Sequence, residues 1–328
     1  RWRDILVPII LVIIAMLVYV LGFGTAVNGA KRWIYIGSFS VQPAEFAKIC
    51  SVMIEAYYLS YCIQKRQAFK LIQSQHGTLV VLAALVELEP DMGTMMIILG
   101  VPLLMLIVAG LNMGKIKNLI FIVVAAATAL CIYQPYRLQR IKVMLDPWAD
   151  AQGMGYQTVQ SITAIGSGGF WGMGLGEGLA KYAYLPEAHT DFAFAVFCQE
   201  NGFLLAAGLI MLYGFLGYFG ARIAKNAYDA YGQVLAGGLV ILICLQAVIN
   251  MFMVSGFLPV IGVPLPFISY GGCSLLVSMA ALGILVNINR YSLIKQLKME
   301  KLTEHNLANR QKPMRLMPGQ RPKLTRIK

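Results

Sequence analysis

Charged side chains stand at only a few places in a chain that is otherwise apolar. Glu45 and Lys48 are three residues apart, so on a helix they share one face and can form an ion pair. Asp191 follows the polar segment 187–190 and stands directly before a long apolar run. By itself, an aspartate in that position is expected to cap the first turn of a helix, where its carboxylate accepts free backbone N–H groups.

A second group of candidates consists of four cations, which are Arg32, Arg137, Arg140 and Lys142. A guanidinium group pairs bidentately with phosphate oxygens, so these residues are candidates for holding a phosphorylated ligand or the acids of a partner protein. Cations near a membrane edge also extend toward lipid headgroups. The residue types alone leave both interpretations open.

The segment 256–272 interrupts the apolar helical pattern with three prolines and four glycines. Prolines and glycines break helices, which leaves backbone groups without their helical partners. At membrane depth such a backbone is tolerated only where it is buried in protein or lines a wet cavity. We therefore expect a cavity at this segment, open to the outer face of the membrane.

The elements that must hold these residues are membrane helices. Of the 328 residues, 58% are hydrophobic and 13% are charged, about half the charged share of a typical soluble domain. Long apolar runs approach the roughly 20 residues that cross the hydrocarbon core. This composition excludes a soluble enzyme and a nucleic-acid-binding module. The runs predict eight transmembrane helices, at 5–23, 43–62, 77–89, 92–111, 117–134, 191–219, 232–257 and 267–288.

The loops between these helices alternate between two sides, and one side carries 20 lysines and arginines while the other carries six. By the positive-inside rule the richer side is cytoplasmic, which places both ends of this chain in the cytoplasm. Residues 1–289 then form a transmembrane bundle, with a large extracytoplasmic loop at 135–190. Residues 290–328 form a basic cytoplasmic tail that we expect to be poorly ordered or bound to anionic lipid.

Several stretches, in order, resemble the SEDS family of bacterial cell-wall synthesis, which comprises the FtsW, RodA and SpoVE proteins. Together they extend over residues 1 to about 290, and they are far more specific in register than any one alone. The Glu-Pro-Asp and Asp-Pro-Trp forms are closer to the FtsW and SpoVE branch than to RodA. The matching stretches are Arg32-Trp33-Ile34, Gln42-Pro43-Ala44-Glu45-Phe46-Ala47-Lys48, Glu89-Pro90-Asp91-Met92-Gly93-Thr94, Tyr136-Arg137-Leu138-Gln139-Arg140, Asp146-Pro147-Trp148, Gly155-Tyr156-Gln157, Tyr184-Leu185-Pro186-Glu187-Ala188-His189-Thr190-Asp191-Phe192 and Pro264-Leu265-Pro266-Phe267-Ile268-Ser269-Tyr270-Gly271-Gly272.

The resemblance implies an all-α, polytopic integral membrane protein of the bacterial cytoplasmic membrane. The family has ten membrane helices, and the first helix predicted here is similar to the family's third. We therefore expect two N-terminal helices of the family to be absent from this sequence. Removing two helices leaves the alternation of sides unchanged, in agreement with the charge count.

In function, the resemblance implies a peptidoglycan glycosyltransferase that polymerises lipid II into glycan strands during cell division or cell-wall growth. Asp191 matches the family's essential aspartate, which implies a general base for the acceptor hydroxyl instead of a cap. Glu45 and Lys48 are expected to be a structural ion pair. The implied substrate-binding residues are Arg32, Arg137, Arg140, Lys142 and His189.

The implied partners are lipid II (an undecaprenyl-pyrophosphate disaccharide-peptide), a class B penicillin-binding protein that acts as transpeptidase, and other division or elongation proteins, but no nucleic acid. The resemblance requires no cofactor; it is compatible with a divalent cation, magnesium or manganese, whose ligands the sequence does not identify. The alternative function is a transporter that flips lipid II without chemistry. Such a transporter needs the same cations but no base, so the carboxylate before the apolar run at 192 favours the polymerase.

Overall fold

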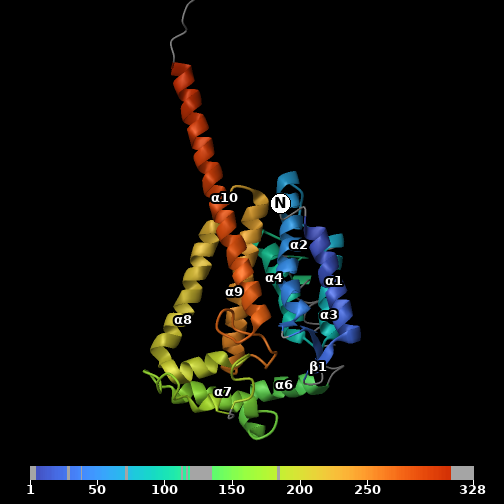
Figure 1. Ribbon diagram of the computed structural model, residues 1–328, viewed down its shortest axis with the longest axis vertical. Helices are drawn as coiled ribbons and strands as arrows, with labels where there is room; N and C mark the ends of the chain where they lie inside the picture. Colours follow the sequence, from blue (N-terminus) through green and yellow to red (C-terminus); the bar gives the residue numbers. More distant parts are fainter. Residues whose placement is uncertain are drawn as a thin grey trace, which may run out of the picture.

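The computed structural model of the chain describes residues 5–27, 30–37, 39–70, 73–111, 114–115, 117–118, 135–182 and 185–311. Its main feature is a bundle of apolar helices that run side by side, closed at one end by a layer of short helices (Figure 1). Among the described residues, five helices are long and apolar enough to cross a membrane. They are α1 (Leu6–Phe23), α2 (Pro43–Lys65), α8 (Ala193–Lys225), α9 (Ala230–Val254) and α10 (Gly272–Gln311).

Two shorter apolar helices, α3 (Ser74–Leu88) and α4 (Met92–Val108), complete the part of the bundle that the structure describes. Seven of the eight predicted spans are therefore helices, and residues 119–134 of the remaining one lie outside the described residues. The centre of the bundle is formed by α2 and α9, which bury most of their residues. In contrast, α8 buries few, so its apolar surface is available to lipid.

The tail differs from the prediction, because α10 does not end near residue 288 but continues to Gln311. The helix extends well beyond the bundle, at the end where the chain begins and opposite to the short helices (Figure 1). Residues 290–311 are rich in leucine, lysine and glutamine and contain neither glycine nor proline. All three are good helix formers, so a basic composition did not mean the absence of regular structure.

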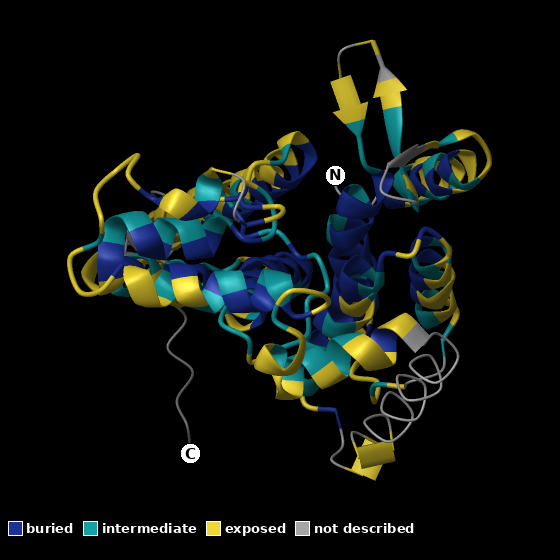
Figure 2. Ribbon diagram, turned by 90° about the horizontal axis from the view of Figure 1, so that it is seen from below, coloured by how far each residue is buried: buried dark blue, intermediate teal, exposed yellow. Residues whose placement is uncertain are grey.

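The short helices at the closed end all belong to the loop 135–190. Together with the start of α8 they form a layer that covers this end of the bundle (Figures 1 and 2). Helix α7 packs against α8 and helix α6 packs against η1. The elements are α6 (Pro135–Leu145), the 3₁₀ helix η1 (Pro147–Asp150), α7 (Tyr156–Ser167) and the 3₁₀ helix η2 (Leu179–Lys181).

A small three-stranded antiparallel sheet, which the all-α prediction did not include, joins α1 to α2. Its strands are β1 (Thr25–Val27), β2 (Ala30–Ile36) and β3 (Phe39–Val41). The pairing of β2 with β3 aligns Ile34 with Val41 and Ile36 with Phe39. The sheet carries Arg32 on its central strand, and so fixes that residue next to the start of α4.

Helix α8 is broken at Gly202, whose backbone angles (φ 70°, ψ −175°) are not helical. The break exposes backbone groups, and the glycine-rich segment 168–174 pairs with them. The N–H groups of residues 173 and 174 donate to the carbonyls of Gln199 and Glu200, each at 3.0 Å. On the other side of the break, the N–H of Phe203 donates to the carbonyl of Gly169 at 2.9 Å. The loop therefore stabilises the bend that lets α8 leave the outer layer and enter the bundle.

We predict that Gly202→Ala strongly destabilises the protein. The conformation at Gly202 is almost exclusive to glycine and costs other residues about 1–3 kcal/mol, and a Cβ there would overlap with the backbone nitrogen of Gly172. The measurement is the thermal unfolding midpoint of the purified protein in detergent. Gly208→Ala in the same helix is the control, because a Cβ at Gly208 meets nothing within 4 Å. Equal midpoints for the two variants would contradict the assigned role of the break.

Candidate active site

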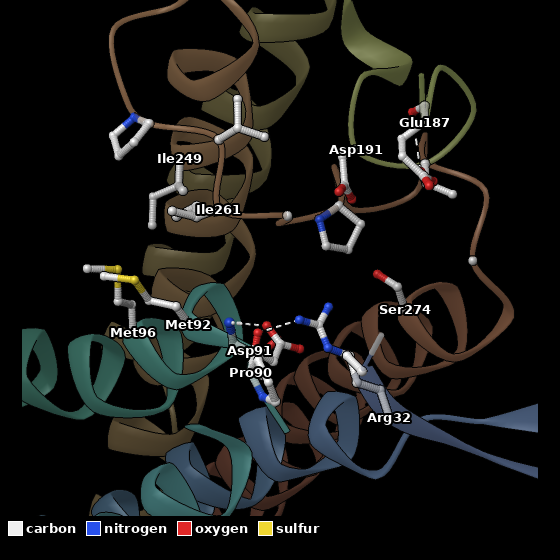
Figure 3. A pocket seen from close by; sticks show the side chains of 18 of the residues that line it. Arg32, Pro90, Asp91, Met92, Met96, Glu187, Asp191, Ile249, Ile261 and Ser274 are labelled. Carbon is white, nitrogen blue, oxygen red and sulfur yellow. Dashed lines mark hydrogen bonds between the residues drawn. The ribbon is translucent and has the colours of Figure 1, made fainter. Parts of the chain in front are cut away.

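A cavity of about 710 Å³ lies at the α6 end of the bundle. Its wall is formed by β2, the starts of α2, α4 and α10, helix α6, and the irregular segments 187–192 and 258–264. Asp191 and Glu187 lie on one side, and Arg32 and Asp91 face them from the other (Figure 3). The charged side chains of the wall are Arg32, Glu45, Asp91, Arg137, Arg140, Glu187 and Asp191.

The irregular segment 256–271 forms part of this wall, as its prolines and glycines led us to expect. Four of its backbone carbonyls receive hydrogen bonds from side chains of other elements, which takes the place of helical pairing. The donors belong to α6, α8 and α9. The pairs are Arg140 Nη1 to Val260, Asn250 Nδ2 to Val263, Gln246 Nε2 to Pro264 and the Tyr213 hydroxyl to Pro266.

Asp191 does not cap α8, although its position in the sequence would allow it. The helix begins at Ala193, its N-cap residue is Phe192, and no side chain caps the first turn. The Asp191 carbonyl accepts a hydrogen bond from Asn250 Nδ2 at 2.8 Å. Its carboxyl group lies beside Gly262, where a Cβ would come within 3.3 Å of Oδ2.

The environment of Asp191 raises its pKa. Burial raises the pKa to about 6, and the negative charges of Glu187 and Asp91 act in the same direction. The positive charges of Arg32 and Arg140 oppose the rise. A carboxylate with a pKa close to neutral pH can both accept a proton and release it, as a general base must.

Arg32 and Arg140 are the two cavity cations without an acidic partner among the described residues. Arg32 donates from Nε to the carbonyl of Glu89 at 3.0 Å and from Nη2 to the carbonyl of Pro90. Arg140 donates to the carbonyl of Val260, and its guanidinium lies 5.5 Å from the ring centroid of Tyr136. Burial lowers the pKa of Arg140, but an arginine stays protonated in proteins. Neutral carbonyls hold both side chains in place and leave their charges available to an anion.

The other predicted substrate-binding residues are placed differently. Arg137 is in the cavity wall but is buried and paired with Glu87, so its charge is already neutralised. Lys142 and His189 are exposed and are not among the lining residues. The His189 carbonyl accepts a hydrogen bond from the N–H of Tyr270 at 2.8 Å, which is a backbone role.

Glu45 and Lys48 form the contact that their spacing predicted. Lys48 Nζ lies 2.7 Å from Glu45 Oε1 and 3.2 Å from Gln246 Oε1, and the lysine is fully buried. The second carboxylate oxygen, Glu45 Oε2, is buried without a hydrogen-bond partner in the described structure. Because Glu45 also lines the cavity, the pair connects the wall of the cavity to α9 through Gln246.

The turn between α3 and α4 places two acids next to Arg32. Asp91 caps α4, with Oδ1 accepting from the N–H of Thr94 at 3.1 Å and Oδ2 from its hydroxyl at 3.0 Å. Glu89 is buried, and both of its carboxyl oxygens are without partners in the described structure. Burial raises the pKa of Glu89 to about 8, the charge of Asp91 acts in the same direction, and the charge of Arg32 opposes the rise.

The residues that the structure describes form no complete protein cage for a metal ion. Among the residues that the structure describes, no group of three or more histidine, cysteine, aspartate or glutamate side chains is close enough to bind one. Divalent cations such as magnesium prefer several oxygen ligands. Magnesium is usually held by one or two carboxylates together with waters and substrate phosphates, so a divalent cation stays a prediction here and we assign no step to one.

Two functional residues of the site, Asn250 and Gln246, were not among those expected from the sequence. They are four residues apart on α9, and both are buried. A signal was present, because polar side chains inside an apolar span are costly and usually have a specific partner. Their amide nitrogens donate to backbone carbonyls of other segments, however, and no motif reveals such contacts.

Comparisons with known proteins agree with this architecture. The family described as "Cell cycle protein", which groups FtsW, RodA and SpoVE, matches residues 1–293. The probable peptidoglycan glycosyltransferase FtsW of Trichlorobacter lovleyi is 41% identical over 295 residues, covering 88% of this chain and 76% of that protein. Stage V sporulation protein E of Bacillus subtilis is 37% identical over 292 residues, covering 89% and 80%.

Solved structures show the same fold. A structure titled as the structural coordination of polymerization and crosslinking by a peptidoglycan synthase complex matches with a TM-score of 0.73 and 26% identity, over 89% of this chain and 83% of that one. The rod shape determining protein RodA of Thermus thermophilus matches with a TM-score of 0.63 and 25% identity, over 88% and 79%. This chain is therefore a polytopic membrane protein, and it belongs to the FtsW, RodA and SpoVE family, on the FtsW and SpoVE side.

We predict that Lys48→Met lowers stability much more than removal of both charges does. The single variant leaves Glu45 charged and buried without its partner, which typically costs about 3–5 kcal/mol. The double variant Glu45→Gln with Lys48→Met removes both charges and should recover most of the loss. Thermal unfolding in detergent measures both. If the double variant unfolds at the wild-type temperature but has lost the activity of the protein, Glu45 has a role in catalysis and not only in stabilising the bundle.

Proposed function

We propose that this protein is a peptidoglycan glycosyltransferase that polymerises lipid II at the outer face of the bacterial cytoplasmic membrane. Its curated relatives carry the name of this activity. The observation in the structure that supports it best is the arrangement around Asp191. A carboxyl group that caps no helix, with a pKa of about 6, shares a cavity with two arginines that form no ion pair within the described part of the chain.

In the proposed reaction, Asp191 accepts the proton of the acceptor 4-hydroxyl while that oxygen attacks the anomeric carbon of the donor. A bond forms between the acceptor oxygen and the anomeric carbon, and the bond between that carbon and the pyrophosphate oxygen breaks. Undecaprenyl pyrophosphate leaves as an anion. Arg32 and Arg140 stabilise the charge that develops on it. A lipid II flippase needs no proton acceptor, and the base at the cavity therefore favours the polymerase.

The chain is further proposed to work with a class B penicillin-binding protein, a transpeptidase, and with other proteins of division or elongation. The similarity to a protein in a peptidoglycan synthase complex supports such a partner. A divalent cation is a further candidate component, held by one or two cavity carboxylates together with waters and the phosphates of the substrate. Turnover of the complex after chelation, with and without added magnesium or manganese, tests this requirement.

We predict that Asp191→Asn abolishes glycan synthesis in a folded protein. Asparagine keeps the size and hydrogen-bonding ability of the side chain but is a far poorer base, so the rate should fall at least about 100-fold. Purified protein with its cognate transpeptidase is incubated with labelled lipid II, and glycan length is measured. Glycan formation at the wild-type rate would remove Asp191 from the mechanism, and full activity without the transpeptidase would contradict the coupling.

The pH dependence provides a second readout of the same site. Because the base must be deprotonated, activity should fall as the pH drops through about 6. Among the groups that act on Asp191, Glu187 and Asp91 raise its pKa while Arg32 and Arg140 lower it. Glu187→Gln should therefore move the acidic midpoint to lower pH. An unchanged midpoint would show that another group controls the acidic limb.

The proposed orientation places both ends of this chain in the cytoplasm and the loop 135–190 outside. We predict that, in a background without native cysteines, Gln152→Cys reacts with an impermeant thiol reagent in intact spheroplasts, while Lys312→Cys reacts only after lysis. The first position follows η1 in the outer layer, and the second lies beyond the described part of α10. The opposite labelling pattern would invert the topology.

A further inference from the structure

Asn250 occupies an unusual position for a polar residue. It lies near the end of α9 and is fully buried. A buried amide at membrane depth is costly unless its N–H groups have partners. Neither of its hydrogen bonds stays within its own helix, which shows that its contacts serve other parts of the fold.

The two hydrogens of the Asn250 amide reach two segments that are far apart in the sequence. Nδ2 donates to the carbonyl of Asp191 at 2.8 Å and to the carbonyl of Val263 at 2.7 Å. The first segment enters α8, and the second belongs to the irregular stretch that follows α9. We propose that Asn250 is the positioning residue of this site, which clamps the backbone at Asp191 to the backbone at Val263 and thereby sets where the Asp191 carboxyl lies.

The neighbouring Gly262 supports this role independently. It has a positive φ of 72°, and a Cβ there would lie 3.3 Å from Asp191 Oδ2. The clamp therefore brings the bare backbone of residue 262 against the carboxyl group and restricts where that group can move. Without the clamp, the backbone at Asp191 loses its hydrogen bond to α9, while Gln246 still holds the irregular stretch at Pro264.

The clamp also fixes the position of Asp191 relative to Arg140. Arg140 donates to the carbonyl of Val260, three residues before Val263, so its guanidinium is held by the same short stretch of backbone. Asn250 thus fixes Asp191 relative to the stretch that holds Arg140. This role rests on the proposed function of Asp191 as a base, and Asn250 itself touches no reacting atom.

The chemistry of asparagine explains why this residue type is needed. One nitrogen that carries two N–H groups can serve two carbonyls at once. Leucine has a similar volume and offers no donor. An ionised aspartate has the same shape but offers only acceptors, which would face two carbonyl oxygens. Asn250→Leu and Asn250→Asp therefore remove the clamp in different ways while filling the space.

The experiment measures lipid II polymerisation by the full chain in complex with its cognate transpeptidase. A misplacement of about 1 Å can lower a rate by about 100-fold, so we expect kcat to fall roughly 10- to 100-fold in both variants, with KM for lipid II changed less than about threefold. In Asn250→Leu, which adds no charge, the acidic midpoint of the pH profile should also move from about 6 toward the ordinary aspartate value, because a released Asp191 gains solvent. Loss of stability alone would not move this midpoint.

Ser161→Ala is the matched control. The buried Ser161 hydroxyl donates to the carbonyl of Val254 at 2.6 Å, one turn beyond Asn250 on α9, and it does not contact Asp191. This variant should lower the unfolding temperature without changing the kcat of the folded fraction or its pH midpoint. The same changes in kcat and midpoint for Ser161→Ala as for Asn250→Leu would overturn the positioning role.

The outcomes separate this inference from the proposed function. If Asp191→Asn is inactive while Asn250→Leu keeps wild-type kcat and midpoint, Asp191 is the base and Asn250 does not position it. If Asp191→Asn is active, the proposed base is wrong, and Asn250 cannot act through it. Loss of kcat in both Asn250 variants, with a lowered midpoint in Asn250→Leu and unchanged kcat and midpoint in Ser161→Ala, supports the clamp.

Discussion

The backbone carbonyls of residues 260–266 must be satisfied, because this stretch lies among membrane helices without being helical itself. A buried carbonyl left without a donor costs about 1–3 kcal/mol. Side chains of α6, α8 and α9 meet the requirement, and Arg140 and Asn250 are among them. The contacts that make this irregular segment tolerable are therefore the contacts that fix a cavity cation and the backbone of Asp191. Stability and the geometry of the site depend on the same hydrogen bonds.

The cations in and next to the cavity fall into two classes that differ in what holds them. Lys48 and Arg137 are buried against carboxylates, so each contributes to the bundle as part of a neutral pair. Arg32 and Arg140 are held by carbonyl oxygens, which orient a guanidinium without neutralising it. Only the second class leaves net positive charge for an anionic ligand. This distinction makes Arg32 and Arg140 the candidates for binding an anionic ligand in the cavity.

Much of the fold could be predicted from the sequence, because apolar length determines membrane helices and Asp91 caps α4 by local chemistry. The sheet at 25–41 and the break at Gly202 could not, since both depend on pairing with other segments.

In the site, the Glu45–Lys48 contact follows from spacing along one helix. Neutralisation of Arg137 by Glu87 and the role of Asn250 are contacts over 50 and 59 residues, which periodicity does not encode. The helical part of the tail, residues 290–311, was not predicted because charge outweighed helix propensity in the prediction.

The electrostatic balance at Asp191 has a consequence for catalysis. Burial, Glu187 and Asp91 raise its pKa, while Arg32 and Arg140 lower it. In the proposed reaction, a pyrophosphate bound to those two arginines neutralises part of the charge that holds the pKa down. Substrate binding would then raise the proton affinity of the carboxylate at the time when the acceptor hydroxyl must lose its proton. The same two side chains would thus bind the leaving group and strengthen the base when the substrate is in place, and Asp191 would be a weaker base in the empty cavity.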